Sequence, residues 1–250
     1  MNGAQRSCDS EECDRFNREL AAAARAMAEE KDTEHTLERA VRTATDLISG
    51  CDFAGVFATR VHGTETPAAS HEALRLVDHL QLELGEGPAV DALRGEFDLL
   101  VVNDLAADGR WQTWSARIVD ELGIHSCLCY RLFTDGETLG ALMLYAKQPH
   151  AFSGPDVENG HAVAAHAAVA LHGALEHEQL HEGMRTRRTI GEAIGLLRGR
   201  YGLTSDQAFA VLKRLSSHRN VKLALIAEHV VDSGDVPGAA DTIAASRERK

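Results

Sequence analysis

The stretch RGRYGLTSDQAF, residues 198–209, contains the end of one helix and the start of the next. Gly199 and Gly202 are typical of a helix end, and Thr204 with Gln207 three positions later matches the capping-box pattern that begins a helix. Basic residues flank the turn on its N-terminal side, and apolar residues follow it. The stretch therefore predicts a helix–turn–helix that could serve packing, DNA reading or binding of another nucleic acid.

Helical periodicity continues on both sides of this turn. Apolar residues at helical spacing predict three helices at 187–198, 205–217 and 221–232, the third capped by Asn220. Phe209 lies beside an alanine on the apolar face of the second helix, so we expect it in the core.

Charge is unevenly distributed along the chain. The 250 residues carry a net charge of −12, yet residues 185–231 contain nine Lys or Arg against three Asp or Glu. Such asymmetry is typical of a protein in which one segment meets a polyanion. The basic segment is therefore a candidate nucleic-acid interface.

Upstream of the basic segment the pattern changes to helices mixed with strands. Residues 11–48 predict helix, and a proline-free run from 155 to about 198 predicts one long helix or two nearly continuous ones. Short apolar segments between turn signals predict strands at 53–59, 99–102, 126–133 and 139–146, with helices at 88–95 and 111–122. Asp135-Gly136 is a hairpin signal, so the sheet is expected to be antiparallel.

Composition limits the class of protein. An apolar fraction of 44% with 26% charged residues is typical of a globular chain. No apolar run is long enough to cross a membrane, and the N-terminus has no secretory apolar region. The cysteines are odd in number and form no disulfide pattern: Cys8, Cys13, Cys51, Cys127 and Cys129. We expect a cytoplasmic protein with reduced thiols that makes no membrane contact.

Several short motifs could carry chemistry, but each has a simpler explanation. His177-Glu178-Gln179-Leu180-His181 fits the H-E-x-x-H zinc pattern, yet no third ligand follows at a suitable spacing. We favour a solvated helix face there, with metal bound at most adventitiously.

Two further motifs lie in the strand-containing region. Cys127 and Cys129 alternate on a strand and are expected to be small core residues on one face. Residues 85–88 could cradle an anion before a helix, but glycines at a turn are the favoured explanation. Trp111 and Trp114 are expected to close a core or a pocket.

Residues 187–231 closely resemble the ANTAR domain of transcription antitermination regulators. The resemblance rests on an ordered set of motifs: Ile190-x-x-Ala193-x-Gly195-x-Leu197, Tyr201-Gly202-Leu203, Ala208-Phe209-x-x-Leu212-x-Arg214, Ser216-Ser217 and Asn220-x-Lys222-Leu223-x-x-Ile226-Ala227.

The region from about 35 to 173 is similar to a GAF domain of the kind fused to ANTAR domains in actinobacteria. The matching segments are LGEGPAVDAL (84–93), VVNDLAADGRW (101–111), ELGIHSCLCYRLF (121–133), LGALMLYAKQPHAFS (139–153) and AAHAAVAL (164–171). Together the two resemblances imply an N-terminal helical segment (1–34), a GAF domain (35–173), a connector helix (174–186), an ANTAR domain (187–234) and a flexible tail (235–250).

The fold class that follows is α+β. An antiparallel sheet flanked by helices is joined by a long connector helix to an all-α three-helix bundle. Exposed apolar positions on such a connector are commonly buried by a second copy, so we expect a homodimer.

The resemblance implies a non-enzymatic RNA-binding regulator that binds tandem hairpins in leader transcripts and prevents formation of a terminator. The GAF domain would sense a signal or mediate dimerisation, and could hold a small-molecule ligand. We expect no cofactor and no bound metal. The alternative is a ligand-sensing dimeric signalling protein whose C-terminal bundle binds a protein partner or DNA.

Candidate RNA contacts follow from the residue types. Basic side chains near the helix ends suit phosphates, short polar ones suit loop bases or the 2′-hydroxyl, and Tyr201 is the ring expected to stack on an unpaired base. A DNA reader is less favoured, because helix 221–232 is too apolar for a groove and helix 205–217 opens with Asp206. The candidates are Arg188, Arg198, Arg200, Tyr201, Lys213, Arg214, Ser216, Ser217, Arg219, Asn220 and Lys222.

Overall fold

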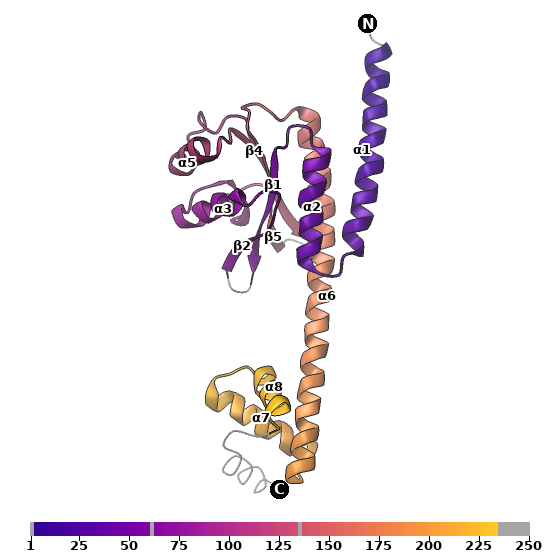
Figure 1. Cartoon of the computed structure of the whole chain (residues 1–250), viewed down its shortest axis with the longest axis vertical. Coiled ribbons are helices and arrows are strands. Elements are labelled where there is room, and N and C mark those ends of the chain that lie inside the picture. The colour runs from indigo at the N-terminus through magenta and orange to yellow at the C-terminus, as the bar shows by residue number, and fades with distance from the viewer. Residues whose placement is uncertain (1–2, 61–62, 135–136, 235–250) are drawn as a thin grey trace. The chain divides into compact units, whose positions relative to one another are not determined.

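The computed structural model describes residues 3–60, 63–134 and 137–234. The chain divides into two compact units, Met1–Glu178 and Gln179–Lys250. Its elements follow in the order α1 (Gly3–Glu29), α2 (Thr33–Leu47), β1 (Phe53–Arg60), β2 (Gly63–Ala69), α3 (Ala73–Leu84), α4 (Pro88–Leu93), β3 (Leu99–Val102), α5 (Gln112–Leu122), β4 (Ser126–Thr134), β5 (Glu137–Ala146), α6 (Gly154–Tyr201), α7 (Ser205–Arg219) and α8 (Leu223–Ser233) (Figure 1).

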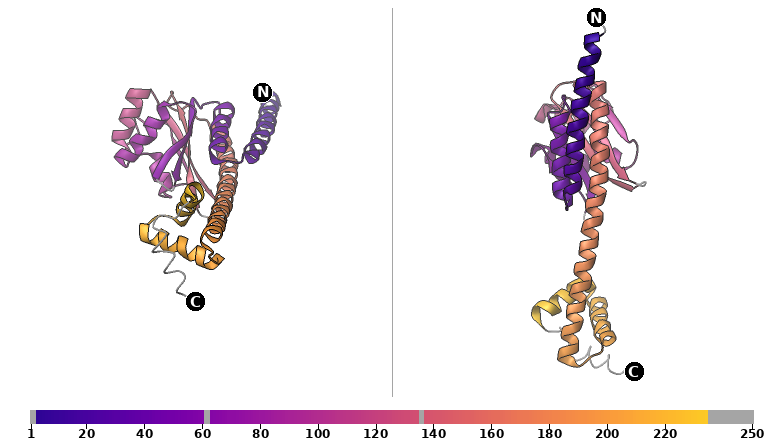
Figure 2. Two further views of the ribbon diagram at one scale, coloured as in Figure 1. Left: turned by 60° about the horizontal axis from the view of Figure 1, so that its bottom comes forward. Right: turned by 90° about the vertical axis from the view of Figure 1, so that its right-hand side faces the viewer.

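The first unit is built on a five-stranded sheet in the order β2-β1-β5-β4-β3, with every neighbouring pair antiparallel. Helices cover both faces: α3 and α5 lie on one side, while α2 and the first part of α6 lie on the other (Figure 1 and Figure 2). The predicted α+β architecture is confirmed.

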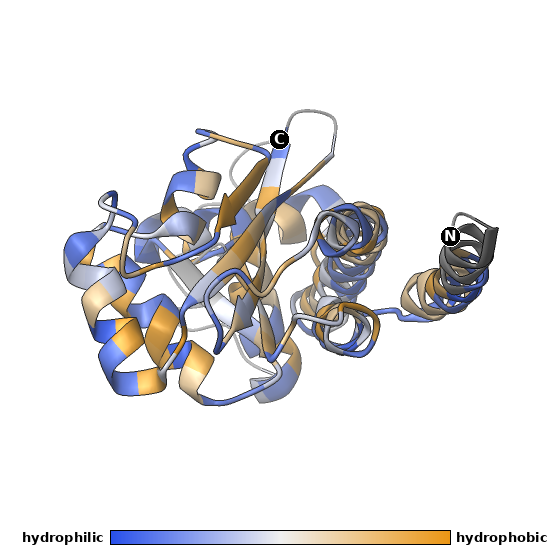
Figure 3. Ribbon diagram, turned by 90° about the horizontal axis from the view of Figure 1, so that it is seen from above, coloured by the Kyte–Doolittle hydropathy of each residue, from blue (hydrophilic) through white to orange (hydrophobic). Residues whose placement is uncertain are grey.

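The sheet separates two apolar cores because successive side chains of a strand point to opposite faces. On β5, Leu142 and Leu144 belong to the core shared with α1, α2 and α6. Met143 and Tyr145 belong to the core shared with α3, α4 and α5. Figure 3 shows these apolar strands between the two helical layers.

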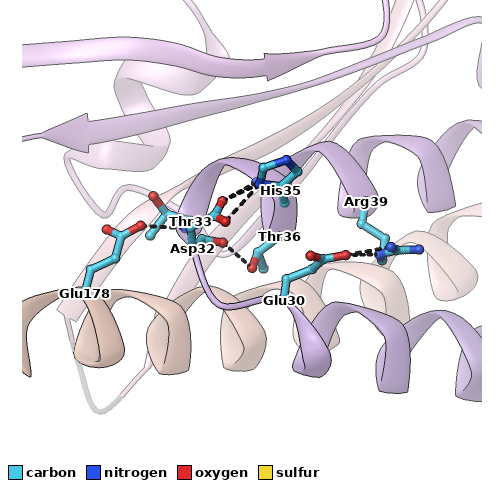
Figure 4. A network of polar contacts seen from close by, with 7 residues as sticks. All are labelled: Glu30, Asp32, Thr33, His35, Thr36, Arg39 and Glu178. Carbon is cyan, nitrogen blue, oxygen red and sulfur yellow. Dashed lines mark hydrogen bonds and ion pairs between the residues drawn. The ribbon is translucent and has the colours of Figure 1, made fainter. Parts of the chain in front are cut away.

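The N-terminal helical region is interrupted around Asp32. Although the pattern at 11–48 predicts helix throughout, α1 ends before this residue and α2 begins after it. The Asp32 carboxylate accepts a hydrogen bond from the amide of His35 at 2.9 Å, which is the contact of a helix N-cap. Glu178 Oε1 accepts a second bond, from the amide of Thr33 at 2.7 Å, and thereby joins this turn to α6 (Figure 4).

Helix α6 runs without interruption from Gly154 to Tyr201, so the proline-free run forms one long helix rather than two nearly continuous ones. Its first part contributes Val163 and Leu171 to a core of the first unit. Its last part contributes Ala193 and Leu197 to the core of the second unit.

The structure contains two elements of the first unit that the patterns did not predict, β2 and α3. Strand β2 is polar and holds Pro67, which is tolerated because β2 is an edge strand. The four predicted strands all form, and the hairpin turn at 135–136 and the tail at 235–250 lie outside the described residues.

The expectations for Cys127, Cys129 and the two tryptophans are confirmed. All four side chains are buried in the core that packs against α3, α4 and α5. Burial raises the pKa of the Cys127 thiol to about 12, so neither a reactive thiolate nor a metal ligand is favoured there.

Candidate nucleic-acid interface

The turn between α6 and α7 is specified by its own residues. Gly202 ends α6 in a left-handed conformation (φ 65°), and its amide donates to the carbonyl of Arg198 at 3.0 Å. Thr204 and Gln207 make both hydrogen bonds of a capping box, which confirms that prediction. Helix α6 continues through Gly199, so Gly202 alone ends it.

The corner between α7 and α8 is built from Ser216 and Asn220. Asn220 adopts a left-handed conformation (φ 52°), and its amide donates to the Ser216 carbonyl. The Ser216 hydroxyl donates to the carbonyl of Val221 at 2.7 Å. Lys222 occupies the N-cap position of α8. The prediction that Asn220 caps the third helix is therefore wrong, because Asn220 instead ends α7.

The two aromatic side chains of the bundle differ in exposure. Tyr201 is half-buried and packs against the core of the second unit. Phe209 lies outside that core and leaves 41% of its surface exposed. The expectation of a core Phe209 is wrong because the buried face of α7 is made by Ala208, Val211, Leu212 and Leu215.

The candidate contact residues gather at the two ends of α7, with Lys213 between them. Arg198, Arg200 and Tyr201 precede α7, whereas Ser216, Ser217, Arg219, Asn220 and Lys222 surround its end. Because α7 has 15 residues, the two groups are separated by about 20 Å along its axis. Arg188 lies almost three turns before Arg198 on α6, so the structure does not bring it to either group.

Some of the basic side chains are already engaged. The Arg200 guanidinium donates to the Gly234 carbonyl just beyond α8, where a cation is favoured by the helix dipole. It also lies 5.8 Å from the centre of the Tyr201 ring. Arg188 Nε donates to Glu192 at 2.9 Å, and this contact raises the pKa of Arg188. Arg200 and Arg188 therefore have structural partners within the bundle.

Other cations are exposed and make no ion pair with any residue in the described part of the chain. They are Arg198, Lys213, Arg219 and Lys222. Arg214 is half-buried on α7. No Asp or Glu occurs anywhere from residue 207 to 227, a run that covers nearly all of α7 and the first half of α8. The run itself therefore contributes no carboxylate that would repel bound phosphates.

The H-E-x-x-H segment of α6 has a structural use. Its glutamate, Glu178, accepts the Thr33 amide described above. Within residues 3–60, 63–134 and 137–234, no group of three or more metal-binding side chains comes together. The geometry therefore assigns Glu178 to the junction of α2 and α6.

A second polar constellation lies inside the first unit. Asp78 is buried and accepts hydrogen bonds from Thr66 Oγ1 at 2.6 Å and from Gln81 Nε2 at 3.1 Å. Burial is the largest influence on this carboxyl group and raises its pKa to about 7. Gln81 Oε1 also accepts the amide of Ala89 at 2.8 Å, and a Cβ at Gly87 would lie 2.3 Å from that oxygen. Residues 85–88 therefore pack against Gln81. Because Pro88 has no amide hydrogen, Ala89 carries the first free amide of α4, and that amide already donates to Gln81 instead of to an anion.

None of the described helices is long and apolar enough to cross a membrane. A GAF domain family model matches residues 30–172, and an ANTAR domain family model matches residues 178–231. No curated protein matches the chain.

Solved structures similar to this chain include proteins of two kinds. The bacteriophytochrome RpBphP3 from the photosynthetic bacterium R. palustris is 13% identical with a TM-score of 0.57, and the match covers 80% of this chain and 46% of that one. The chain thus spans less than half of the bacteriophytochrome's length. The GAF domain of an Acinetobacter phosphoenolpyruvate-protein phosphotransferase is 14% identical with a TM-score of 0.52, and the match covers 70% of this chain and 97% of that one.

At these identities the structural likenesses concern the fold, whereas the family matches extend over most of the sequence. A GAF sheet and an ANTAR bundle, both regulatory modules, follow each other in one chain. The protein therefore belongs to the GAF domain family and is a regulator of the GAF–ANTAR architecture.

Proposed function

We propose that this protein is an RNA-binding transcription antitermination regulator. Its ANTAR bundle binds tandem hairpins in a leader transcript, and the bound RNA fold excludes the terminator. The GAF domain senses a signal or mediates dimerisation. The protein acts in the cytoplasm as a regulator without catalytic activity of its own.

The observation that carries this proposal is the surface of α7 and α8. Lys213, Arg219 and Lys222 are exposed there, within a run of 21 residues (207–227) that contains no acidic side chain. The rest of the protein is strongly acidic, so the basic surface is not a consequence of overall composition. A local cationic surface on an acidic protein is the expected footprint of a polyanion-binding site.

We further propose that the protein is a homodimer formed along α6. Three apolar side chains of this helix are largely exposed: Val169 at 68%, Leu180 at 68% and Met184 at 58%. In the first unit, Val169 and Gly173 line a groove of about 500 Å³ between α1 and α6. Burial of such side chains against a second copy is favourable. Sedimentation of the wild type and of the Leu180→Glu variant tests this, because only the variant is expected to be monomeric.

A gel-shift titration with a tandem-hairpin RNA, repeated over a series of salt concentrations, tests the RNA-binding function. Phosphate contacts release counterions, so the affinity should fall steeply and log-linearly with salt. Absence of binding at low salt would overturn the proposal.

Charge reversal on α7 sharpens that experiment. Lys213→Glu should abolish measurable binding at moderate salt, because it replaces an exposed cation with an acid inside the acid-free run 207–227. Arg185→Glu is the matched control, since Arg185 lies on α6 and is paired with Glu182 at 3.2 Å. Equal loss of binding in both variants would indicate a nonspecific charge effect and contradict a site on α7.

A protein-binding bundle is the second candidate function. Leu196 and Leu225 are exposed to 45% and 53%, and such side chains suit a protein partner. This alternative predicts no RNA binding at any salt concentration.

A further inference from the structure

We infer that Phe209 is a base-stacking residue: an unpaired nucleobase of the bound RNA stacks on its exposed ring, on the face of α7 that also carries Lys213 and Ser217. This inference rests on the proposed RNA-binding function. It assigns a role to a side chain that sequence periodicity places in the core.

The first support is the exposure of the ring. Phe209 keeps 41% of its surface exposed and is not among the buried residues that form the core of the second unit. The exposed part of the ring is aromatic surface that a stacked nucleobase would remove from water.

The second support is the face on which the ring lies. Phe209, Lys213 and Ser217 follow each other at intervals of four residues on α7, and all three are exposed. Side chains at this spacing are neighbours on a helix surface, with about 5–6 Å between Cβ atoms. A ring, an ammonium group and a hydroxyl group are therefore aligned along one side of α7.

These three groups match the parts of a single-stranded nucleotide. A nucleobase stacks on an aromatic ring irrespective of its identity, while an ammonium group binds the adjacent phosphate. A hydroxyl group can reach a base edge or the 2′-hydroxyl of the ribose. Unstacked bases of this kind occur in hairpin loops rather than in paired stems.

Charge favours RNA over a protein as the occupant of this face. Beyond Phe209, the next acidic residue along the chain is Glu228, so α7 offers only cations and neutral groups from that point onward. Asp206 lies one turn before Phe209 and is the last acidic residue before the acid-free run begins. Phosphates are therefore expected on the Lys213 side of the ring.

Tyr201 is less suited to this role. Its ring is half-buried against the core, and the Arg200 guanidinium lies near it. Phe209 is thus the more exposed of the two rings.

The experiment uses the full-length protein and a two-hairpin RNA that carries 2-aminopurine at one loop position at a time. Stacking changes the fluorescence of this base, so the assay reports the contact as well as the affinity. Phe209→Leu keeps an apolar side chain without a ring, and Phe209→Trp keeps the ring. Phe133→Leu is the matched control, because Phe133 of the first unit is exposed to 40%.

We expect Phe209→Leu to weaken binding roughly 5- to 100-fold and to remove the fluorescence change at one loop position. The slope of affinity against salt should remain that of the wild type, because no phosphate contact is lost. Phe209→Trp and Phe133→Leu should bind like the wild type. Circular dichroism of each variant verifies that helix content is retained.

The outcomes separate this inference from the proposed function. If the wild type binds RNA and Phe209→Leu binds equally well with the same fluorescence change, the stacking role is overturned and the RNA-binding function stands. If Phe209→Leu weakens binding only by shifting the monomer–dimer equilibrium in sedimentation, the ring is a protein contact and the inference is wrong. If the wild type does not bind, both fail.

Discussion

The carboxylate of Glu178 accepts a hydrogen bond from the backbone amide of Thr33, 145 positions away in the sequence, at 2.7 Å. Thr33 is the first residue of α2, and the first amides of a helix have no partner within it. A carboxylate at this end also meets the positive end of the helix dipole. Glu178 thus acts as a second cap for α2, provided by α6.

We therefore expect Glu178→Ala to destabilise the start of α2 by about 1 kcal/mol. Amide hydrogen exchange measures this directly, because the Thr33 amide should exchange faster. Glu176→Ala is the control, since Glu176 is exposed and its contact with His172 spans 3.7 Å. Unchanged protection of Thr33 in the Glu178 variant would show that the bond contributes nothing.

The buried carboxyl group of Asp78 predicts a pH dependence of stability. Its pKa in the folded protein is about 7, whereas an unfolded Asp titrates near about 3.9. The folded state therefore holds the proton more tightly, and the stability it contributes at low pH is lost as the pH rises from about 4 to about 7. Arg75 lies near enough to favour the charged form but does not outweigh burial.

The Asp78→Asn variant checks this dependence. Because the amide cannot ionise, the unfolding free energy of the variant should fall less over that pH range than that of the wild type, by an amount on the order of a few kcal/mol. Urea unfolding at several pH values gives the comparison. Parallel pH profiles would contradict a neutral buried Asp78.

Substitution by alanine is expected to have opposite effects on stability at Gly202 and at Gly199. Gly202→Ala should destabilise the bundle by about 1 kcal/mol, because its φ of 65° is strained for a residue with a side chain. Gly199→Ala should stabilise it by about 1 kcal/mol, because Gly199 lies inside α6 and a Cβ there would meet nothing within 4 Å. Thermal melts followed by circular dichroism distinguish the two, and a shift in the same direction for both would refute the assigned end of α6.

Removal of the negative charge of Asp206 is expected to raise the affinity for RNA. Asp206→Asn removes the acid one turn before Phe209 and should strengthen binding by about 0.5 kcal/mol, a factor of two to three. The same gel shift measures it. Asp120→Asn, on α5 of the first unit, controls for the change in net charge and should leave the affinity unaltered.

Much of the fold was predictable from periodicity and turn chemistry. Apolar strands such as 126–133 and the capping box at Thr204 are local signals, and each forms where expected. The break at Asp32 depends partly on Glu178, which is distant in sequence, and strand β2 owes its place to pairing with β1. Contacts of this kind have no local signature.

The candidate interface was less predictable because position along a helix does not determine which face is buried. Phenylalanine is a residue type that is typical of cores. Phe209 is nevertheless exposed, because four neighbouring apolar side chains already fill the buried face of α7. Arginine is a residue type that commonly binds phosphate, but Arg200 donates a hydrogen bond to the backbone just beyond α8. Only packing distinguishes these roles.

The way in which the bundle's helix ends are specified has a consequence for its evolution. Gly202, Thr204 and Gln207 determine the first turn among themselves, and Ser216 with Asn220 determines the second corner. Lys213 is exposed between these points and takes no part in defining either helix end. A substitution at Lys213 can therefore alter what the surface of α7 binds while both helix ends keep the contacts that specify them.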